Sequence, residues 1–282
     1  MANHFRFLRQ YRGPLKACIL DWSGTTADKY VLAPAVVFAE VFKKHKVPIS
    51  MAEARGPMGL RKDLHIDAIT KVPEVRERWK DVYGRYPNQE DVDNMFKDFV
   101  PMQLDCLRQY TDLLPGCADA VNRMKNEFGM KIGTTTGFLR SMVDILAEEA
   151  AKQGYVPDVT VAGDEVINGA RPNPHMVYRN MDLLNIQTIQ SVVKVDDTVT
   201  GVGEALNAGC WAVGVAKYSN YMDIDDFEHE ASLSKEEMAR RLAYSTNLLV
   251  NSGAHYVVDS IADLPAVCED INERLKRGET PM

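Results

Sequence analysis

The first residue of this 282-residue chain with a clear chemical signal is Asp21, which directly follows the apolar run Leu15–Leu20. It begins a turn, Asp-Trp-Ser-Gly-Thr-Thr, at positions 21–26. A carboxylate on such a turn can attack phosphorus, while neighbouring backbone N–H groups hold the phosphoryl oxygens. We therefore interpret Asp21 as a candidate nucleophile, with Ser23 and Gly24 in the turn that would bind the phosphoryl group.

Three later positions offer the groups that such a nucleophile needs. Thr136 and Gly137 follow another apolar run and supply a hydroxyl and a backbone amide suited to phosphate. Arg171 supplies a fixed cation whose two-pronged geometry matches phosphate oxygens. Asp196 and Asp197 supply carboxylates, which are ligands that Mg²⁺ prefers. Each feature alone is usually a helix cap, a turn or a solvated charge, but together and in this order they predict a Mg²⁺-dependent phosphoryl site.

The elements that must position these residues alternate along the chain. Short runs, mostly rich in β-branched residues, predict strands at Leu15–Leu20, Met130–Thr135, Asp158–Ala162, Val192–Val195, Trp211–Val215 and His255–Val258. Amphipathic patterns predict helices at Arg140–Gln153, Pro174–Leu184, Val202–Ala208 and Ser234–Ser252. Strand–helix alternation indicates an α/β fold with a doubly wound parallel sheet, whose ligands bind beyond the carboxyl ends of the strands.

One segment, residues 30–105, contains no clear strand. Its amphipathic patterns predict helices at Ala33–His45, Ser50–Ala54, Lys62–Thr70, Pro73–Tyr83 and Glu90–Tyr110. We expect Pro101 to kink or split the last of these. The interpretation is an α-helical cap domain at 30–105, inserted into an α/β core domain formed by 1–29 and 106–282, with hinges near 28–33 and 106–115.

Composition excludes several classes of protein. The net charge of −7 and the lack of a basic run argue against binding to nucleic acid or to an anionic membrane. Residues 1–13 lack a signal-peptide layout, and no run of about 18 apolar residues could span a bilayer. Five scattered cysteines without a Cys-x-x-Cys pair predict reduced thiols. We expect a cytoplasmic enzyme that acts on a small molecule.

The order of the chemical groups resembles the haloacid dehalogenase superfamily over essentially the whole chain. That resemblance makes Asp21 the nucleophile and Thr136 the second motif. It places Arg171 where the third motif has a cation, and Asp197 at the fourth, metal-binding motif. It implies Mg²⁺ held by Asp21, the backbone carbonyl of Ser23, and Asp197. Phosphatases of the superfamily typically carry an aspartate where this chain has Ser23, and serine cannot replace that acid.

The cap carries a more specific likeness. The sequence Glu-Ala-Arg-Gly-Pro-Met-Gly-Leu-Arg-Lys-Asp-Leu-His at 53–65 closely resembles the cap of phosphonoacetaldehyde hydrolases, whose lysine forms a Schiff base with the substrate. Lys62 stands at that position. By the same resemblance, Met58 lines the site and His65 relays protons through water near the lysine. The implied activity is cleavage of the carbon–phosphorus bond of phosphonoacetaldehyde, a small phosphonate, by a homodimer that associates through its caps.

The implied chemistry explains why a lysine is needed. A carbon–phosphorus bond has no leaving oxygen to protonate, so cleavage would leave a carbanion beside the aldehyde. An imine with Lys62 turns the aldehyde into an electron sink. The lysine must be neutral to attack, so its pKa must be lowered by burial or by nearby cations such as Arg171.

Some positions differ from the family pattern, and other functions stay open. Gly201 stands where an acidic residue is usual, Asp196 where glycine is usual, and Phe138 where close relatives carry tyrosine; Val31 is a further difference. The main alternative is a Mg²⁺-dependent phosphatase or phosphomutase for a small phosphate ester, in which Lys62 would only set specificity. A dehalogenase and a non-catalytic scaffold are the others. Residues 218–236 are expected to form an exposed loop leading into a helix.

Overall fold

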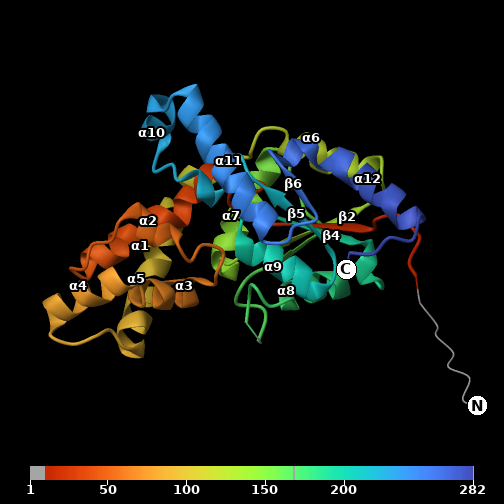
Figure 1. Cartoon of the computed structure of the whole chain (residues 1–282). Coiled ribbons are helices and arrows are strands. Elements are labelled where there is room, and N and C mark those ends of the chain that lie inside the picture. Colours follow the sequence, from red (N-terminus) through yellow and green to blue (C-terminus); the bar gives the residue numbers. More distant parts are fainter. Residues whose placement is uncertain (1–9, 168, 282) are drawn as a thin grey trace, which may run out of the picture.

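The computed structural model describes residues 10–167 and 169–281, which form a six-stranded parallel sheet and flanking helices (Figure 1). The strands, in the order β3-β2-β1-β4-β5-β6 across the sheet, are β3 (Val159–Val161), β2 (Lys131–Thr135), β1 (Ala17–Leu20), β4 (Val192–Asp196), β5 (Trp211–Val215) and β6 (Tyr256–Val258). In register, Leu20 lies opposite both Thr134 and Val195. The residues that follow β1, β2 and β4 therefore meet at one edge of the sheet.

Helices cover both faces of the sheet, as expected for a doubly wound fold. One face is covered by α6 (Cys117–Asn126), α7 (Arg140–Lys152) and α12 (Leu264–Lys276). The other is covered by α8 (His175–Leu183), α9 (Val199–Ala208) and α11 (Lys235–Asn251). The central strand β1 and strand β5 consist entirely of buried residues without a charged or hydroxyl side chain, which is what two covered faces require. The predicted α/β fold class is confirmed.

The cap consists of the first five α-helices after β1, which Figure 1 shows to one side of the sheet. They are α1 (Leu32–Lys44), α2 (Met51–Arg55), α3 (Lys62–Thr70), α4 (Pro73–Tyr83) and α5 (Gln89–Cys106). Helix α5 packs against both α1 and α3, and the rings of Phe38 and Phe99 stack 4.6 Å apart between them. This aromatic stack belongs to a buried apolar cluster that the cap shares with the core domain.

Two chain segments connect the cap to the core, and they lie side by side. Ala27 and Leu113 form an antiparallel bridge, and the Asp28 N–H donates to the carbonyl of Asp112 at 3.2 Å. Three non-glycine residues of the first segment, Asp28, Tyr30 and Val31, have φ between 54° and 63°. Such left-handed conformations are costly and cluster where a backbone must turn sharply. The domain boundaries at residues 30 and 105 stay a prediction.

Several details differ from the sequence-based expectations. Helix α5 runs unbroken through Pro101, whose side chain is exposed, so water can bond the carbonyl that lacks an N–H partner. Helices α6 and α12 were not expected. The prediction that residues 218–236 begin as an exposed loop is wrong. Asn220 and Met222 lie in the short helix η4 (Asn220–Met222), and both are buried. The segment then continues into α10 (Phe227–Ser232) and α11.

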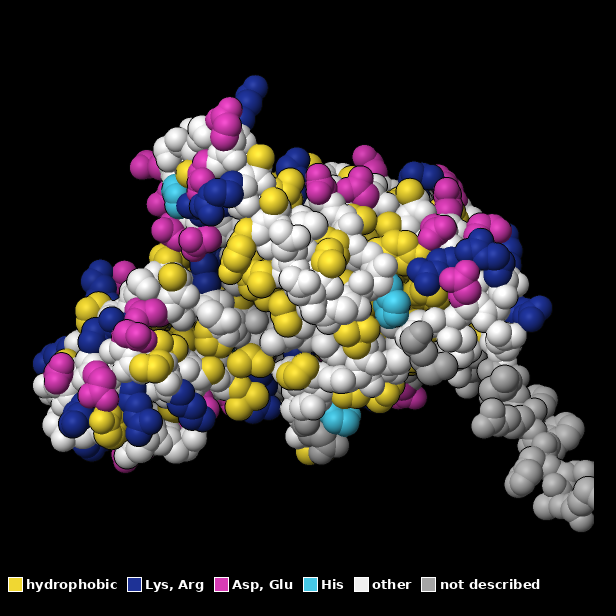
Figure 2. Space-filling view, in the orientation of Figure 1, with side chains coloured by type: hydrophobic (Ala, Val, Ile, Leu, Met, Phe, Trp, Pro, Cys, Tyr) yellow, Lys and Arg dark blue, Asp and Glu magenta, His cyan; other side chains and the backbone are white. Residues whose placement is uncertain are grey.

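The surface agrees with the charge balance of the sequence. On the visible face, basic and acidic side chains are mixed over the cap and the C-terminal helices, and apolar side chains gather where cap and core meet (Figure 2). All five cysteines are free. None of the helices in the described part of the chain combines the length and apolar character that crossing a bilayer needs. Residues 1–9, which bear on the signal-peptide prediction, lie outside the described residues.

Candidate active site

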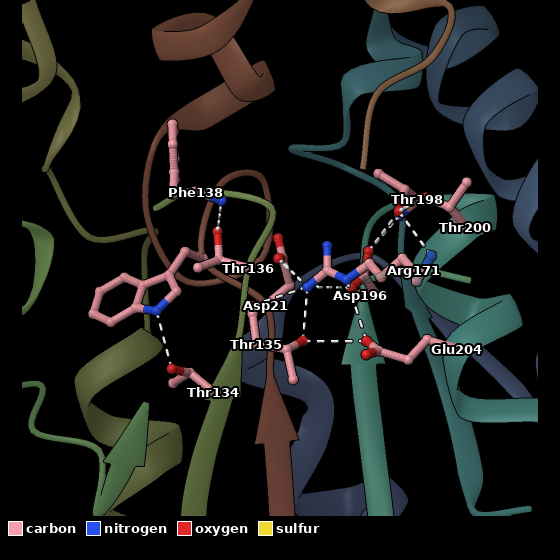
Figure 3. Close-up of polar contacts among 12 residues, drawn as sticks. Asp21, Thr134, Thr135, Thr136, Phe138, Arg171, Asp196, Thr198, Thr200 and Glu204 are labelled. Atoms are coloured by element: carbon pink, nitrogen blue, oxygen red, sulfur yellow. Dashed lines mark hydrogen bonds and ion pairs between the residues drawn. The ribbon is translucent and has the colours of Figure 1, made fainter. Parts of the chain in front are cut away.

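Eight of the ten sequence-predicted site residues line one small cavity between core and cap. They are Asp21, Ser23, Met58, Lys62, Thr136, Gly137, Arg171 and Asp197. The cavity has a volume of about 20 Å³, which admits about one water molecule. The core residues come from the ends of adjacent strands and from the loop before α8, and the close-up shows Asp21, Thr136 and Arg171 near one another (Figure 3). The cap is therefore closed down on the site.

Arg171 is the hub of a buried polar network beneath this cavity. Its Nη2 donates to Asp21 Oδ1 at 2.6 Å and to Thr135 Oγ1 at 2.7 Å, and its Nε lies 3.2 Å from Glu204 Oε2 (Figure 3). Burial opposes its charge, but Asp196, Asp21 and Glu204 outweigh that effect and raise the pKa of Arg171. The guanidinium is thus a permanent, fixed cation beside the candidate nucleophile.

The carboxylates around the cavity have a composition that suits a divalent cation. Oxygen atoms of Asp21, Asp196 and Asp197 lie within 4.8 Å of one another, and all three residues are buried. Burial, together with the charges of Asp21 and Asp196, raises the pKa of Asp197 well above its usual value. Asp197 Oδ1 is buried without a hydrogen-bond partner among the described residues. A hard cation would relieve this repulsion and satisfy that oxygen, so the donor set fits Mg²⁺.

Lys62 reaches this cavity from the first turn of α3, and only 4% of its surface is exposed. Burial is the main influence on its amine, and Arg171 acts in the same direction, while Asp21 and Asp28 oppose them; the net effect lowers the pKa of Lys62 to about 8. The Nζ atom lies 4.5 Å from the centre of the Phe138 ring. About a tenth of the amine is therefore neutral at pH 7, far more than for an ordinary lysine with a pKa of about 10.4.

His65 lies behind Lys62 and does not line the cavity. Its Nε2 is 2.8 Å from the carbonyl of Ala54, so Nε2 carries the proton, and its ring stacks on Phe38 at 3.9 Å. Nδ1 is buried and has no partner among the described residues. Burial and the neighbouring Lys62 lower the pKa of His65 well below its usual value. The histidine is therefore neutral with a free lone pair on Nδ1, and its low pKa means that it would hold an accepted proton only briefly.

The two predicted phosphate-binding glycines occupy different settings. The Gly24 amide already donates to the carbonyls of Ala27 and Asp28 at 2.8 and 3.1 Å, so its predicted role at the phosphoryl group stays a prediction. Gly137 lies directly under the cap, because a Cβ there would stand 2.6 Å from the carbonyl oxygen of Leu60. The Thr136 hydroxyl accepts from the Phe138 N–H at 3.1 Å, which orients it within the loop.

Comparison with known proteins identifies the family to which a chain with this site belongs. The family model described as haloacid dehalogenase-like hydrolase matches residues 19–215. The phosphonoacetaldehyde hydrolase of Syntrophobacter fumaroxidans is 40% identical over 273 residues, covering 97% of this chain and 98% of that protein. That of Salmonella agona is 41% identical over 268 residues, covering 95% and 99%. The chain belongs to the phosphonoacetaldehyde hydrolase family. It is a hydrolase of the haloacid dehalogenase superfamily, as its motifs predicted.

Solved structures agree with this assignment. The crystal structure of a phosphonoacetaldehyde hydrolase-like protein from Oleispira antarctica superimposes with a TM-score of 0.94 at 36% identity, covering 99% of this chain and all of that one. A β-phosphoglucomutase from Clostridium difficile gives a TM-score of 0.66 at 17% identity, which is a likeness of fold alone. The phosphonoacetaldehyde hydrolase family likeness therefore extends through the cap.

Two of the departures from the family pattern are one structural feature. The Asp196 carboxylate receives Lys194 Nζ at 2.7 Å, Arg171 Nη2 at 3.2 Å and the Thr198 hydroxyl at 2.7 Å. A Cβ at Gly201 would lie 1.8 Å from Asp196 Cγ. The carboxylate of residue 196 thus fills the space that a side chain at 201 would need. In this member of the phosphonoacetaldehyde hydrolase family, aspartate at position 196 leaves room only for glycine at position 201.

The other departures also face the site. The Phe138 ring lies beside the amine of Lys62, so the position keeps an aromatic contact although the tyrosine hydroxyl is lost. Val31 is buried and lines the cavity at the start of α1. Neither change removes a group that the phosphonoacetaldehyde hydrolase motifs supply.

Several polar residues that support the site carry little or no signal in the sequence and were not predicted. Glu204 and Lys194 pair with the Arg171 network, and Ser219 and Asn220 bond Asp197. A signal existed for the first two: Glu204 is the only charged residue of α9, and Lys194 is the only basic residue in the apolar strand β4. Charged residues in otherwise apolar elements need partners, so they point to a buried network. No comparable signal marked Ser219 and Asn220.

Proposed function

We propose that the chain hydrolyses the carbon–phosphorus bond of phosphonoacetaldehyde to acetaldehyde and phosphate. The observation that carries this proposal is the position of Lys62: a buried amine with a pKa of about 8, in the same cavity as the Asp21 carboxylate and Arg171. A phosphatase has no use for a neutral amine facing its nucleophile, whereas an aldehyde substrate does. The names of the relatives from Syntrophobacter fumaroxidans and Salmonella agona support the same reaction.

The proposed reaction begins at the aldehyde. Neutral Lys62 adds to the carbonyl, and the resulting carbinolamine takes up one proton and loses water, which gives a protonated imine. Asp21 attacks phosphorus, and the electrons of the breaking carbon–phosphorus bond move into the imine, which becomes an enamine. Protonation at carbon and addition of water release acetaldehyde and free Lys62. A second water cleaves the aspartyl-phosphate, so that one water is consumed in each full cycle.

Each neighbouring residue has a defined part in this scheme. Arg171 and Thr136 bind the phosphoryl oxygens, and Arg171 also holds Asp21 in place through the 2.6 Å contact. His65, whose Nδ1 is unpaired, accepts and returns the protons of imine formation through water. Met58 lines the cavity and excludes water from the imine.

The residues that would hold Mg²⁺ are Asp21, the backbone carbonyl of Ser23, and Asp197. When bound there, the cation neutralises charge on the phosphoryl oxygens and on the attacking carboxylate. Asp196 is already engaged by Lys194, Arg171 and Thr198. We therefore assign it to support of the site and not to direct coordination.

The test is acetaldehyde release from phosphonoacetaldehyde in the presence of Mg²⁺, followed by coupled NADH oxidation. Lys62→Ala is compared with Lys71→Ala, a control lysine that caps the same helix and pairs with Asp67 on the surface. We expect turnover in the wild type and in the Lys71 variant, and none in the Lys62 variant. Borohydride added during turnover should trap the substrate on the peptide containing Lys62.

A generic aryl phosphate, assayed in parallel, tests the alternative of a Mg²⁺-dependent phosphatase or phosphomutase. Aryl phosphate hydrolysis that is indifferent to Lys62, together with no acetaldehyde, would sink the carbon–phosphorus proposal. We expect acetaldehyde release and little aryl phosphate hydrolysis, because Ser23, two positions after Asp21, cannot protonate a leaving oxygen.

We infer a role in the degradation of 2-aminoethylphosphonate, a cytoplasmic location, and a homodimer formed through the caps. Exposed apolar side chains of the cap, Val82, Tyr83 and Tyr86, are compatible with that dimer. Light scattering of the wild type and of a Tyr83→Glu variant would test it, since the charged variant should be monomeric.

A further inference from the structure

Arg55 is a buried arginine of the cap that the proposed reaction does not use. It ends α2 and is only 4% exposed. Its Nη1 donates to the carbonyl of Tyr30 at 2.6 Å and to Asn220 Oδ1 at 3.2 Å, and its Nη2 donates to the carbonyl of Ile224. These acceptors are all neutral. The carboxylate of Asp225 lies 3.9 Å away and is 44% exposed. Arg55 therefore fastens the cap to the core mainly through directional hydrogen bonds.

Asn220 carries this connection onward to the active site. Its side-chain Nδ2 donates back to the carbonyl of Arg55 at 3.2 Å, so the two residues exchange hydrogen bonds. Its backbone N–H donates to Asp197 Oδ2 at 2.9 Å. The Ser219 hydroxyl donates to the Asp197 carbonyl at 2.8 Å. A continuous chain of bonds thus runs from the cap through Asn220 to the carboxylate proposed to bind Mg²⁺.

The closed site needs such a connection, because it must also open. The cavity of about 20 Å³ under Lys62 is far too small for phosphonoacetaldehyde, which has seven non-hydrogen atoms. The substrate must enter while the cap is displaced. Arg55 bonds cross the seam where this displacement occurs. A second cavity of about 480 Å³ opens on the outer side of the same seam and is lined by Arg55, Asn220 and Tyr244, so solvent reaches it.

We propose that Arg55 is a positioning residue that latches the cap shut over the active site, and that Asn220 relays this closure to Asp197. The latch orients Asp197 through Oδ2 and leaves its unpartnered Oδ1 for the cation. By thermodynamic reciprocity, occupation of the metal site favours the closed cap. The proposal rests on the proposed function only in taking Asp197 as a metal ligand.

The test measures cap opening without any substrate. Lys62 is buried when the cap is closed, so its rate of modification by an amine reagent, read by mass spectrometry of its peptide, reports the open population. We compare the wild type with Arg55→Met at one pH. The control is Arg78→Met: Arg78 bonds Glu53 at 2.6 Å, and both residues lie within the cap. Because this assay needs no carbon–phosphorus cleavage, its failure is distinct from failure of the proposed activity.

We expect Lys62 to be modified at least about tenfold faster in Arg55→Met than in the wild type, since one hydrogen bond from a charged group is worth about that factor. The control should stay within about twofold of the wild type. Asn220→Ala, a second variant that keeps the backbone contact to Asp197, should show a smaller increase. In the Arg55→Met background, Asn220→Ala should add less than it does alone, because the Arg55 Nη1–Asn220 Oδ1 bond is already lost and only the Asn220 Nδ2 bond to the backbone carbonyl of residue 55 remains.

Two further readouts separate a latch from a general structural role. Mg²⁺ should slow Lys62 modification in the wild type and do so less in Arg55→Met. Guanidinium at millimolar concentration should partly restore slow modification in Arg55→Ala, because the outer cavity gives it access to the vacated position. Equal acceleration in the Arg55 and Arg78 variants, or no acceleration in either Arg55→Met or Asn220→Ala, overturns the proposal.

Discussion

The effect of Gly201→Ala on stability should change sign according to whether residue 196 is aspartate or alanine. A Cβ at position 201 would lie 1.8 Å from Asp196 Cγ and 2.1 Å from both of its carboxylate oxygens. These are the three atoms nearest to it. Real Cβ contacts do not come this close, so Asp196 must move. We expect Gly201→Ala to destabilise the wild type although the residue lies in helix α9, where alanine is normally the better residue.

The magnitude follows from what Asp196 holds. Moving its carboxylate weakens the contacts to Lys194 at 2.7 Å and Arg171 at 3.2 Å, and the next carboxylate to Lys194 is Glu204 at 3.9 Å. Leaving a buried charge without its partner costs about 3–5 kcal/mol. We expect Gly201→Ala to cost about 3 kcal/mol or more. In an Asp196→Ala background the obstacle is gone, and the same change should stabilise by about 0.5–1 kcal/mol.

Urea unfolding of the four proteins, with EDTA present, measures this coupling. The wild type, the two single variants and the double variant form a double-mutant cycle, with a coupling of about 4 kcal/mol expected. If Gly201→Ala has the same effect in both backgrounds, or stabilises the wild type, then the carboxylate of Asp196 does not fill this space in solution. The control is Gly209→Ala, at a position beyond the end of the helix with open space around it. Its effect on stability should be the same with and without Asp196.

Three more predictions concern the site. Because Lys62 has a pKa of about 8 and attacks only as the neutral amine, kcat/KM should fall about tenfold per pH unit below pH 8 and level off above it, as a pH–rate profile would reveal. Mg²⁺ at 100 times its Kd should stabilise the wild type by about 2.7 kcal/mol, and calorimetry should show that Asp197→Ala loses this gain. Without metal, Asp197→Ala should be more stable than the metal-free wild type, because the substitution removes a carboxylate that repels its neighbours. Gly137→Ala places a Cβ 2.6 Å from the Leu60 carbonyl, so kcat/KM should drop at least about tenfold at an unchanged melting temperature; wild-type kcat/KM would contradict the closed-cap geometry.

The fold was largely predictable because its signals are local. Strand β5 and helices α3 and α4 begin and end where their patterns predicted, since burial of short β-branched runs and amphipathic periodicity leave direct traces in sequence. Pro101 misled the interpretation because a proline on an exposed helix face loses only a bond that water can replace.

The candidate site was predictable at strand ends and less so elsewhere. Asp21, Thr136 and Asp197 converge because parallel neighbouring strands bring their carboxyl ends together. Which oxygen each side chain offers depends on long-range partners. That Asp196 is occupied by Lys194 follows from packing of strand and helix and not from spacing.

The cap–core seam was the least predictable part. Arg55 and Asn220 are 165 positions apart, and neither carries a local signal of its partner. The start of the segment 218–236 looked like a solvated loop because polar and acidic residues dominate it. This segment is buried where Asn220 meets Arg55 of the cap, and no local pattern encodes a contact between residues 165 positions apart.

The paired connection between cap and core has a consequence for protein engineering. Because Asp28 and Asp112 are already hydrogen-bonded neighbours, the chain leaves the core and returns to it at a single point. The ends created by excising the intervening residues would need only a short turn to rejoin, at little cost in chain entropy. The cap is in this sense a removable module: one scaffold could receive other lids, and each graft would inherit the carboxylate cluster while bringing its own substrate-recognising groups.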